Sequence, residues 1–270
     1  MSRLFGETCA AVRDIVKEQI DFRELTLQMV TRDLLLRYKQ SVMGFGWAIF
    51  MPLLNTLVFT IIFTQIAPVK TAVPYPLFAY VGLTGWNLTA GALRFAVNSL
   101  TGNVSLVTKV HFPREIFPFS AVIVSLVDTA VAWALLALMM AYYGVAPSST
   151  IAFLPVVVVV QLLFTAAVAL VLSMSNLFFR DVKYIFDIAI MVWMFASSVV
   201  YPITNVGPRI GALMALNPMT HILDAYRAVI FDGRIPDSPA FMVTAVSSAV
   251  LLLTCWLWFH STEYKFAENI

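Results

Sequence analysis

Six long stretches of this sequence contain almost no charged side chains, and this feature limits the possible folds more than any other. A transmembrane helix needs about 20 consecutive apolar residues, because the hydrocarbon core of a bilayer is about 30 Å thick. Only 12% of the residues are charged, compared with roughly 25% in soluble domains, which excludes a soluble globular enzyme. The pattern predicts an all-α membrane protein with six transmembrane helices, at 44–66, 75–97, 117–143, 151–178, 185–201 and 240–260.

The distribution of basic residues predicts the orientation of these helices. Loops on the cytoplasmic side of a membrane carry an excess of Lys and Arg. Here 13 of the 17 Lys and Arg residues lie in the N-terminal segment, in the connections 94–116 and 179–184, or in the tail. Both termini are therefore expected in the cytoplasm. We expect a single domain with a cytoplasmic N-terminus at 1–43, a transmembrane bundle at 44–260 and a cytoplasmic tail at 261–270.

Residues 21–41 precede the first predicted span and are expected to form an N-terminal amphipathic interface helix. Its apolar side chains fall into two stripes, so that one stripe can lie in the lipid interface while the other packs on protein. The basic side chains then lie at headgroup depth, where anionic phosphates collect. A helix that only anchors the chain is the alternative. The residues of this expected headgroup site are Arg32, Arg37, Tyr38 and Lys39.

Polar and small residues follow one face of two predicted spans, 75–97 and 185–201. They recur at intervals of three or four residues, which places them on a single face of each helix. Polar groups inside a span are costly and normally face the bundle interior or a water-filled path. We interpret these faces as walls of a conduit; the alternative is close helix packing through small residues. The predicted lining residues are Tyr80, Thr84, Asn87, Gly91, Met191, Met194, Ser198 and Tyr201.

Asp128 is the one charge predicted to lie deep in the membrane, near the middle of the span 117–143. An ionised Asp at that depth costs roughly 2.5–3.5 kcal/mol, so it needs a partner or a proton. A hydrogen-bonded or protonated structural Asp is the simpler interpretation. A proton-coupled secondary transporter that uses Asp128 is the alternative, although such proteins usually place several ionisable groups at this depth.

The cytoplasmic connection 99–116 mixes apolar and basic side chains, a composition suited to docking on a soluble partner. The chain has no G-x-x-x-x-G-K-[ST] loop and cannot hydrolyse ATP by that route. Its two cysteines, Cys9 and Cys255, lie far apart, and no Cys/His cluster suggests a metal. We therefore expect no cofactor in this chain. The net charge of +2 gives no support for a nucleic-acid partner.

The outer connection between the last two predicted spans, 202–239, is unusually apolar. The dipeptide Asn217-Pro218 divides it into two pieces, each too short to cross a bilayer. Two short re-entrant helices that dip back from the outer face fit this pattern. His221 and Asp224 are spaced as neighbours on a helix, and we expect a capping or gate contact there rather than catalysis.

Three motifs resemble those of one family. The segment Arg32–Ser41 (RDLLLRYKQS), followed by Gly44, Trp47 and Pro52, resembles the N-terminal signature of the membrane subunits of bacterial polysaccharide ABC exporters. The segment Lys109–Glu115 (KVHFPRE) resembles their cytoplasmic coupling loop. The third motif resembles their periplasmic gate and comprises Tyr201-Pro202, Leu216–Met219 and Arg227.

The resemblance implies a homodimer in the bacterial inner membrane, bound to two copies of a separate P-loop ATPase that carries ATP and Mg²⁺. A lipid-linked polysaccharide, with O-antigen the first expectation and teichoic acid or capsular polymer the alternatives, passes through a channel between the subunits. An intramembrane glycolipid transferase is a weaker alternative. The implied site residues are Trp86 as a further channel-lining aromatic, Val107, Lys109, His111, Phe112, Pro113 and Arg114 in the coupling loop, and Pro202, Asn217, Pro218, Asp224 and Arg227 in the gate.

Overall fold

The computed structural model describes residues 13–39, 46–109 and 112–266, which contain helices and no strand. Residues 13–21 are helical as well. The π-helical turn Ile62–Ile66 extends α3, and Ser149–Phe153 precedes α7. The helices are α2 (Arg23–Tyr38), α3 (Gly46–Ile61), α4 (Tyr75–Ala96), α5 (Val104–Lys109), α6 (Ile116–Tyr143), α7 (Leu154–Phe178), α8 (Val182–Phe195), α9 (Pro208–Met214), α10 (Pro218–Arg227) and α11 (Pro239–Thr262).

Local sequence explains where many of these helices begin and end. Proline lies in the first turn of α4, α7, α9, α10 and α11, where its missing N–H removes no helical hydrogen bond. Side-chain oxygens of Asn217 and Ser238 cap α10 and α11. At the other end of α6, Gly144 has a φ of 67°, a left-handed conformation that glycine adopts without steric cost.

Four helical segments in the described part of the chain are long and apolar enough to cross a membrane: Ile49–Ile66, Ile116–Tyr143, Ser149–Phe178 and Pro239–Lys265. They correspond to four of the six predicted spans. The predicted span 75–97 forms α4, whose threonines, glycines and Asn87 lower its hydropathy. The predicted span 185–201 forms α8, which ends at Phe195, before turns at 196–201. The described part of this membrane protein is thus all-helical, with four candidate spans.

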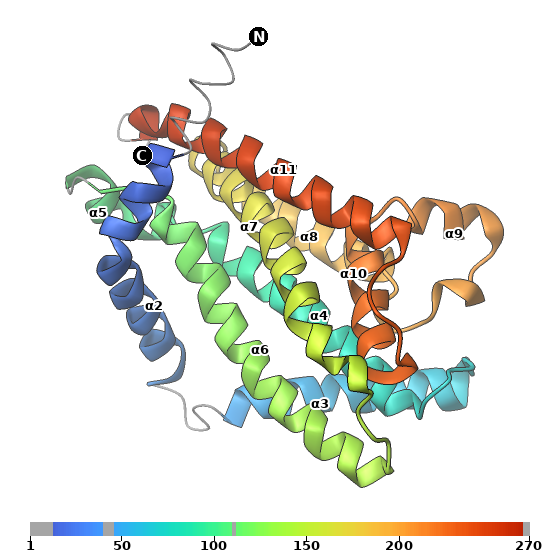
Figure 1. The fold of residues 1–270 in the computed structure, drawn as a ribbon. Coiled ribbons are helices and arrows are strands. Elements are labelled where there is room, and N and C mark those ends of the chain that lie inside the picture. The colour runs from blue at the N-terminus through green and yellow to red at the C-terminus, as the bar shows by residue number, and fades with distance from the viewer. Residues whose placement is uncertain (1–12, 40–45, 110–111, 267–270) are drawn as a thin grey trace.

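Helix α4 lies at the centre of the bundle, packed against α3, α6, α7 and α10 (Figure 1). Most of its side chains are buried, which explains how a helix so rich in small and polar residues is accommodated. Helix α11 packs along α7. In contrast, α3 and one side of α8 leave most of their apolar side chains exposed on the single chain.

The predicted interface helix is present as α2 and packs alongside α6 (Figure 1). Met29 is buried in a cluster that includes Phe117 and Phe259. Val30, from the other predicted stripe, is buried as well, whereas Leu27 and Leu36 are exposed, although Leu36 lies two turns after Met29 on the same side of the helix. Each predicted stripe thus has a buried and an exposed member, so the two stripes do not separate into a protein-facing side and an outward-facing side.

Candidate functional site

A cavity of about 340 Å³ lies between α2, α3, α4 and α6. It combines residues that the sequence assigned to two different roles, the headgroup site and the conduit. We call it the α2–α6 cavity, and its lining residues are Arg37, Tyr38, Trp47, Pro52, Thr84, Asn87, Gly91, Ser125, Asp128, Thr129 and Ala132.

Asp128, the deep charge of α6, has two partners in this cavity. Arg37 forms an ion pair with Asp128 through Nη1 and Oδ2. The Tyr38 hydroxyl donates a hydrogen bond of 2.6 Å to Oδ1 of the same carboxylate. The Arg37 guanidinium also lies over the Phe95 ring, 3.8 Å from its centroid. Because both carboxylate oxygens are paired with donors, Asp128 needs no proton to be accommodated at this depth.

The two other basic residues of the predicted headgroup site lie outside the cavity. Arg32 forms an ion pair of 2.7 Å with Asp33 and donates a hydrogen bond of 2.9 Å to Asn103. Arg32 therefore links α2 to the turn before α5. Lys39 follows the last residue of α2 and is exposed.

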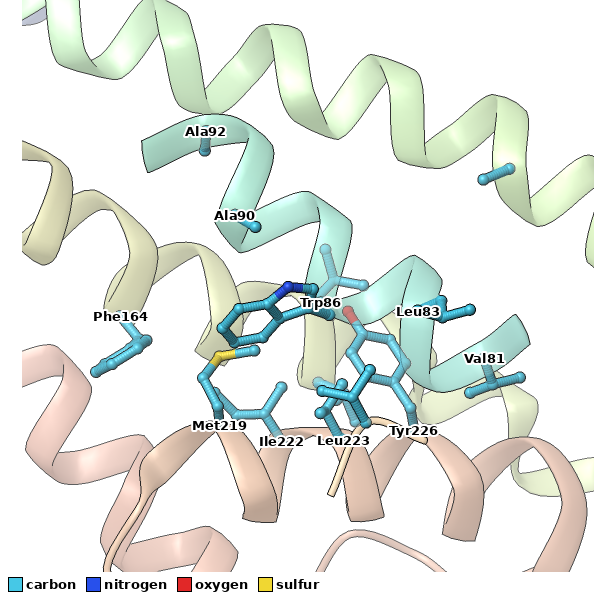
Figure 2. Packing of buried hydrophobic residues seen from close by; sticks show 14 of the residues in the cluster. Val81, Leu83, Trp86, Ala90, Ala92, Phe164, Met219, Ile222, Leu223 and Tyr226 are labelled. Carbon is cyan, nitrogen blue, oxygen red and sulfur yellow. The ribbon is translucent and has the colours of Figure 1, made fainter. Parts of the chain in front are cut away.

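Two aromatic residues predicted to line a conduit are buried in the core instead. Tyr80 is fully buried and donates a hydrogen bond of 2.9 Å to the carbonyl of Ala132. Figure 2 shows Trp86 extending from α4 towards Met219 on α10, and its ring meets Trp193 edge-on at 5.5 Å. The physical reason is that α6 covers the Tyr80 side of α4 and α10 folds back over the Trp86 side. In the single chain, Tyr80 and Trp86 thus contribute packing rather than an open aromatic wall.

The predicted lining residues of α8 and the turns after it do not share one environment. Met191 is exposed and Met194 is half-buried. Ser198 is fully buried. The Tyr201 hydroxyl donates to the carbonyl of Phe195. The predicted stripe is broken because α8 stops at Phe195, so the last two residues are displaced from the helical face.

Two of the predicted gate residues, Asp224 and Arg227, lie together in a group that we call the Arg227 cluster: Phe78, Ser198, Val199, Asp224 and Arg227. The Arg227 guanidinium donates a hydrogen bond of 2.7 Å to the Val199 carbonyl and lies 3.3 Å from Asp224. It also lies 3.8 Å above the Phe78 ring, and Ser198 donates a 3.0 Å hydrogen bond to Asp224. The cluster attaches the end of α10 to α4 and to the turn after α8.

Asn217 makes a second attachment between α10 and the end of α8. Its side-chain oxygen accepts hydrogen bonds from the Met219 amide and from the Trp193 indole, both at 3.1 Å. Its amide group donates to the Ala196 carbonyl at 3.0 Å and to Ser197 at 2.7 Å. The predicted break before Pro218 is therefore the start of α10. Pro202, the other gate residue, is half-buried beside these turns.

Most described residues of the predicted coupling loop face inward. Val107, Phe112 and Pro113 are buried, so they stabilise the loop rather than present a docking surface. Arg114 donates to the Val107 carbonyl and forms an ion pair of 2.9 Å with Glu263. His111 lies outside the described residues. The exposed side of α5 consists of Val104, Ser105, Thr108 and Lys109.

Glu115, next to this loop, is a buried carboxylate that the sequence reasoning missed. His260 Nδ1 lies 3.0 Å from its Oε1. Together with Glu263 these residues form a group of two carboxylates and one imidazole, and the atoms of this group that could bind a metal ion lie within 4.8 Å of one another. Arg114 and His260 already pair with these carboxylates. Burial raises the pKa of Glu115 and the nearby Glu263 raises it further, whereas hydrogen bonding, including that from His260, opposes the shift.

The raised pKa of Glu115 predicts a pH-dependent stability. A carboxyl whose pKa is higher in the folded state stabilises the fold below its unfolded pKa, and this contribution is lost as the pH rises through the folded pKa. We expect Glu115→Gln to remove this loss, so that the melting temperature falls less as the pH rises above the ordinary pKa of a carboxyl. Thermal unfolding in detergent at several pH values measures this dependence. If the melting temperatures of the wild type and of Glu115→Gln change equally with pH, the pKa of Glu115 is not raised in the folded protein.

Gln161 joins three helices in the core and was also missed, although an amide in the middle of a long apolar span is a visible signal in the sequence. Its amide group donates to the Gly85 carbonyl at 2.5 Å and to Thr89 at 2.9 Å. Its oxygen accepts a hydrogen bond of 2.7 Å from the Tyr226 hydroxyl. Helices α4, α7 and α10 are thus connected through one fully buried side chain.

Tyr226→Phe tests this connection. The change leaves the Gln161 oxygen buried without its tyrosine donor, which costs about 1–3 kcal/mol of folding free energy. We expect a lower melting temperature in detergent, measured by thermal unfolding. Tyr142→Phe is the control, because Tyr142 is 84% exposed. Equal melting temperatures for both variants would show that the hydrogen bond contributes nothing.

Comparison with known proteins places this arrangement in a family. Residues 24–231 match the family model described as ABC-2 type transporter. The chain is 32% identical to the O-antigen export system permease protein RfbA of Myxococcus xanthus, over 95% of this chain and 99% of that protein. It is 26% identical to the protein of the same name from Klebsiella pneumoniae, over 91% and 94%. The matched region includes the α2–α6 cavity, α5 and the Arg227 cluster. The chain therefore belongs to the ABC-2 type transporter family as a permease, which is a transport subunit rather than a catalytic one.

Proposed function

We propose that this chain is the membrane subunit of an ATP-driven exporter of a lipid-linked polysaccharide, with O-antigen as the expected polymer. The observation that carries the proposal is the similarity, over nearly the whole chain, to permeases named for O-antigen export. The α2–α6 cavity supports it, because it places a cation, a carboxylate and hydroxyl groups together inside an otherwise apolar protein. Capsular polysaccharide and teichoic acid are the alternative polymers.

We further propose that the chain crosses the inner membrane six times with both termini in the cytoplasm. In this topology α4 is the second span, and α8 together with the turns 196–201 that follow it is the fifth. Neighbouring helices or a second subunit shield both. Helices α9 and α10 form the two short re-entrant pieces, each too short to cross. The positive-inside distribution of Lys and Arg supports this orientation.

The proposed assembly is a homodimer with two copies of a P-loop ATPase. The outward-facing apolar side chains of α3 and α8 suit either lipid or a second copy of the chain. The exposed side of α5, with Lys109 at its end, is the proposed docking site for the ATPase. The chain itself supplies no catalytic group for ATP hydrolysis, so ATP and Mg²⁺ belong to the partner.

The test is purification of the tagged permease from gently solubilised native membranes, followed by export from proteoliposomes made with whatever co-purifies. We expect a P-loop ATPase at one-to-one stoichiometry and ATP-dependent movement of lipid-linked polysaccharide. An oligomer without an ATPase whose transport follows a proton gradient would overturn the proposal in favour of a secondary transporter. The ion pair between Arg37 and Asp128 argues against that alternative, since Asp128 is already compensated.

A further inference from the structure

The start of α6 and the end of α11 meet at the group formed by Glu115, His260 and Glu263. Glu115 directly precedes α6, whereas His260 lies in the last turn of α11 and Glu263 follows that helix. The His260 Nδ1 atom lies 3.0 Å from Oε1 of Glu115 and 3.7 Å from Oε2 of Glu263. Both carboxylates therefore turn an oxygen towards the same imidazole nitrogen. Glu115 and His260 are 145 residues apart, so their spacing in the sequence does not suggest a metal site.

The separations of these atoms suit three ligands of one metal ion. Imidazole nitrogen and carboxylate oxygen bind Zn²⁺ at about 2.0–2.2 Å, which places neighbouring ligand atoms of a tetrahedral site roughly 3.3–3.5 Å apart. The two separations from His260 Nδ1, 3.0 and 3.7 Å, lie on either side of this value. All three ligand atoms lie within 4.8 Å of one another. Shifts of a few tenths of an ångström at the imidazole, with a larger adjustment between the carboxylates, complete the geometry.

The Glu115 carboxylate has fewer partners than a buried carboxylate normally has. Its side chain is 0% exposed, and its Oε2 atom has no hydrogen-bond partner among the described residues, apart from an interaction of the carboxylate with its own backbone N–H. A buried polar atom without a partner needs an explanation, and an ion is one of the usual ones. The His260 side chain is 40% exposed, so an ion can approach the group from solvent on the imidazole side.

Arg114 neutralises part of the charge of this group and orients one ligand. Its guanidinium pairs with Oε1 of Glu263 at 2.9 Å, which leaves Oε2 turned towards His260. Arg114 also donates to the Val107 carbonyl in α5, as a supporting residue behind a metal ligand does. Two carboxylates and one guanidinium leave one negative charge when the imidazole is neutral. Either a proton on His260 or a bound cation compensates this charge.

We infer that Glu115, His260 and Glu263 bind a divalent transition-metal ion of the Zn²⁺ class. The ligands are His260 Nδ1 and one oxygen of each carboxylate, a set that suits Zn²⁺, with water as the fourth ligand. Binding releases any proton from Nδ1 to solvent, because a metal ligand must be deprotonated. The ion ties the end of α11 to the start of α6 and, through Arg114, to α5. The inference is independent of the proposed transport function, and the role of the ion is structural.

The first test titrates Zn²⁺ into the full-length protein, purified in detergent with a histidine-free tag and stripped of metal. Excess Mg²⁺, which prefers oxygen ligands, is present throughout. We expect one Zn²⁺ per chain and an affinity at least about tenfold lower for His260→Asn, whose amide still donates to Glu115. His221→Asn is the control, because His221 lies outside the group and pairs with the Ala215 carbonyl at 2.7 Å. Equal affinities of the two variants overturn the inference in favour of adventitious zinc only. A wild type that binds no Zn²⁺ overturns it in favour of a protonated imidazole.

A second variant keeps the test decisive if His260→Asn does not fold. Glu263→Gln keeps the shape of the side chain and removes a carboxylate ligand, and Glu24→Gln, at an exposed position of α2, is its control. Zn²⁺ at 100 times its Kd is expected to raise the melting temperature of the wild type and of Glu24→Gln by about 5–10 °C, and to leave that of Glu263→Gln unchanged. Equal shifts in the two variants, or no shift in the wild type, overturn the inference. The pH dependence expected for Glu115 is measured with EDTA, so that metal binding does not enter it. Neither zinc measurement involves an ATPase or a polymer, so failure here leaves the proposed function untouched.

Discussion

Gly82→Ala is expected to lower the melting temperature of the protein by about 10 °C, because the added methyl group has no room. An ideal Cβ at Gly82 would overlap the carbonyl oxygen of Val199, and it would lie 2.5 Å from Arg227 Nη2. The backbone of Val199 cannot rotate away as a side chain can. Overpacking costs typically about 1–3 kcal/mol and occasionally more, and 3 kcal/mol corresponds to about 10 °C for a chain of this size.

Gly91→Ala is the matched control, since Gly91 lies on the same helix. Its Cβ would come no closer than 3.4 Å to Ser125 Oγ, the end of a small side chain. Alanine is also favoured over glycine in a helix by about 1 kcal/mol, so we expect Gly91→Ala to leave the melting temperature unchanged or slightly raised. Thermal unfolding in detergent measures both variants. Similar melting temperatures would show that α4 and the turn at Val199 are farther apart than described.

The sequence was sufficient to predict the class of the protein and much of its architecture. Long segments with few charges identify membrane helices where apolar side chains dominate, as in α6, α7 and α11. The same criterion is weak for α4, because a helix surrounded by other helices can carry threonine, glycine and asparagine. These residues lower the hydropathy of α4 below that of the four candidate spans.

The partner of Asp128 could not be predicted in the same way. A deep carboxylate must have a compensating group, but Arg37 lies 91 residues earlier in the sequence and its own pattern suits an interface helix equally well. Only the packing of α2 along α6 brings the two together. The burial of Tyr80 and Trp86 has a similar origin, because it depends on α6 and α10 packing against α4. Periodicity identifies a face of a helix, and tertiary structure decides what covers that face.

Arg227→Met is the second change for which we expect a large loss of stability. Methionine fills much of the same volume but removes the hydrogen bond to the buried Val199 carbonyl, the ion pair with Asp224 and the contact with the Phe78 ring. An unpaired buried acceptor costs about 1–3 kcal/mol, and a desolvated cation–π contact contributes about 2 kcal/mol. We expect a loss of about 3 kcal/mol, with Asp224 contributing little because its side chain is 43% exposed.

The order of three variants tests whether this loss belongs to the Arg227 cluster. Arg227→Lys keeps the charge but lacks the planar group that reaches Val199 and Asp224 together, so its melting temperature should fall between those of the wild type and Arg227→Met. Arg234→Met is the control, because the Arg234 side chain is 73% exposed and its pair with Asp232 is on the surface, where ion pairs contribute about 0–1 kcal/mol. Because the cluster attaches α10 to α4 and to the turn after α8, polymer export should decline in the same order. Arg227→Met and Arg234→Met proteins that unfold at the same temperature would show that this buried cation does not hold α10 against α4 and the turn after α8.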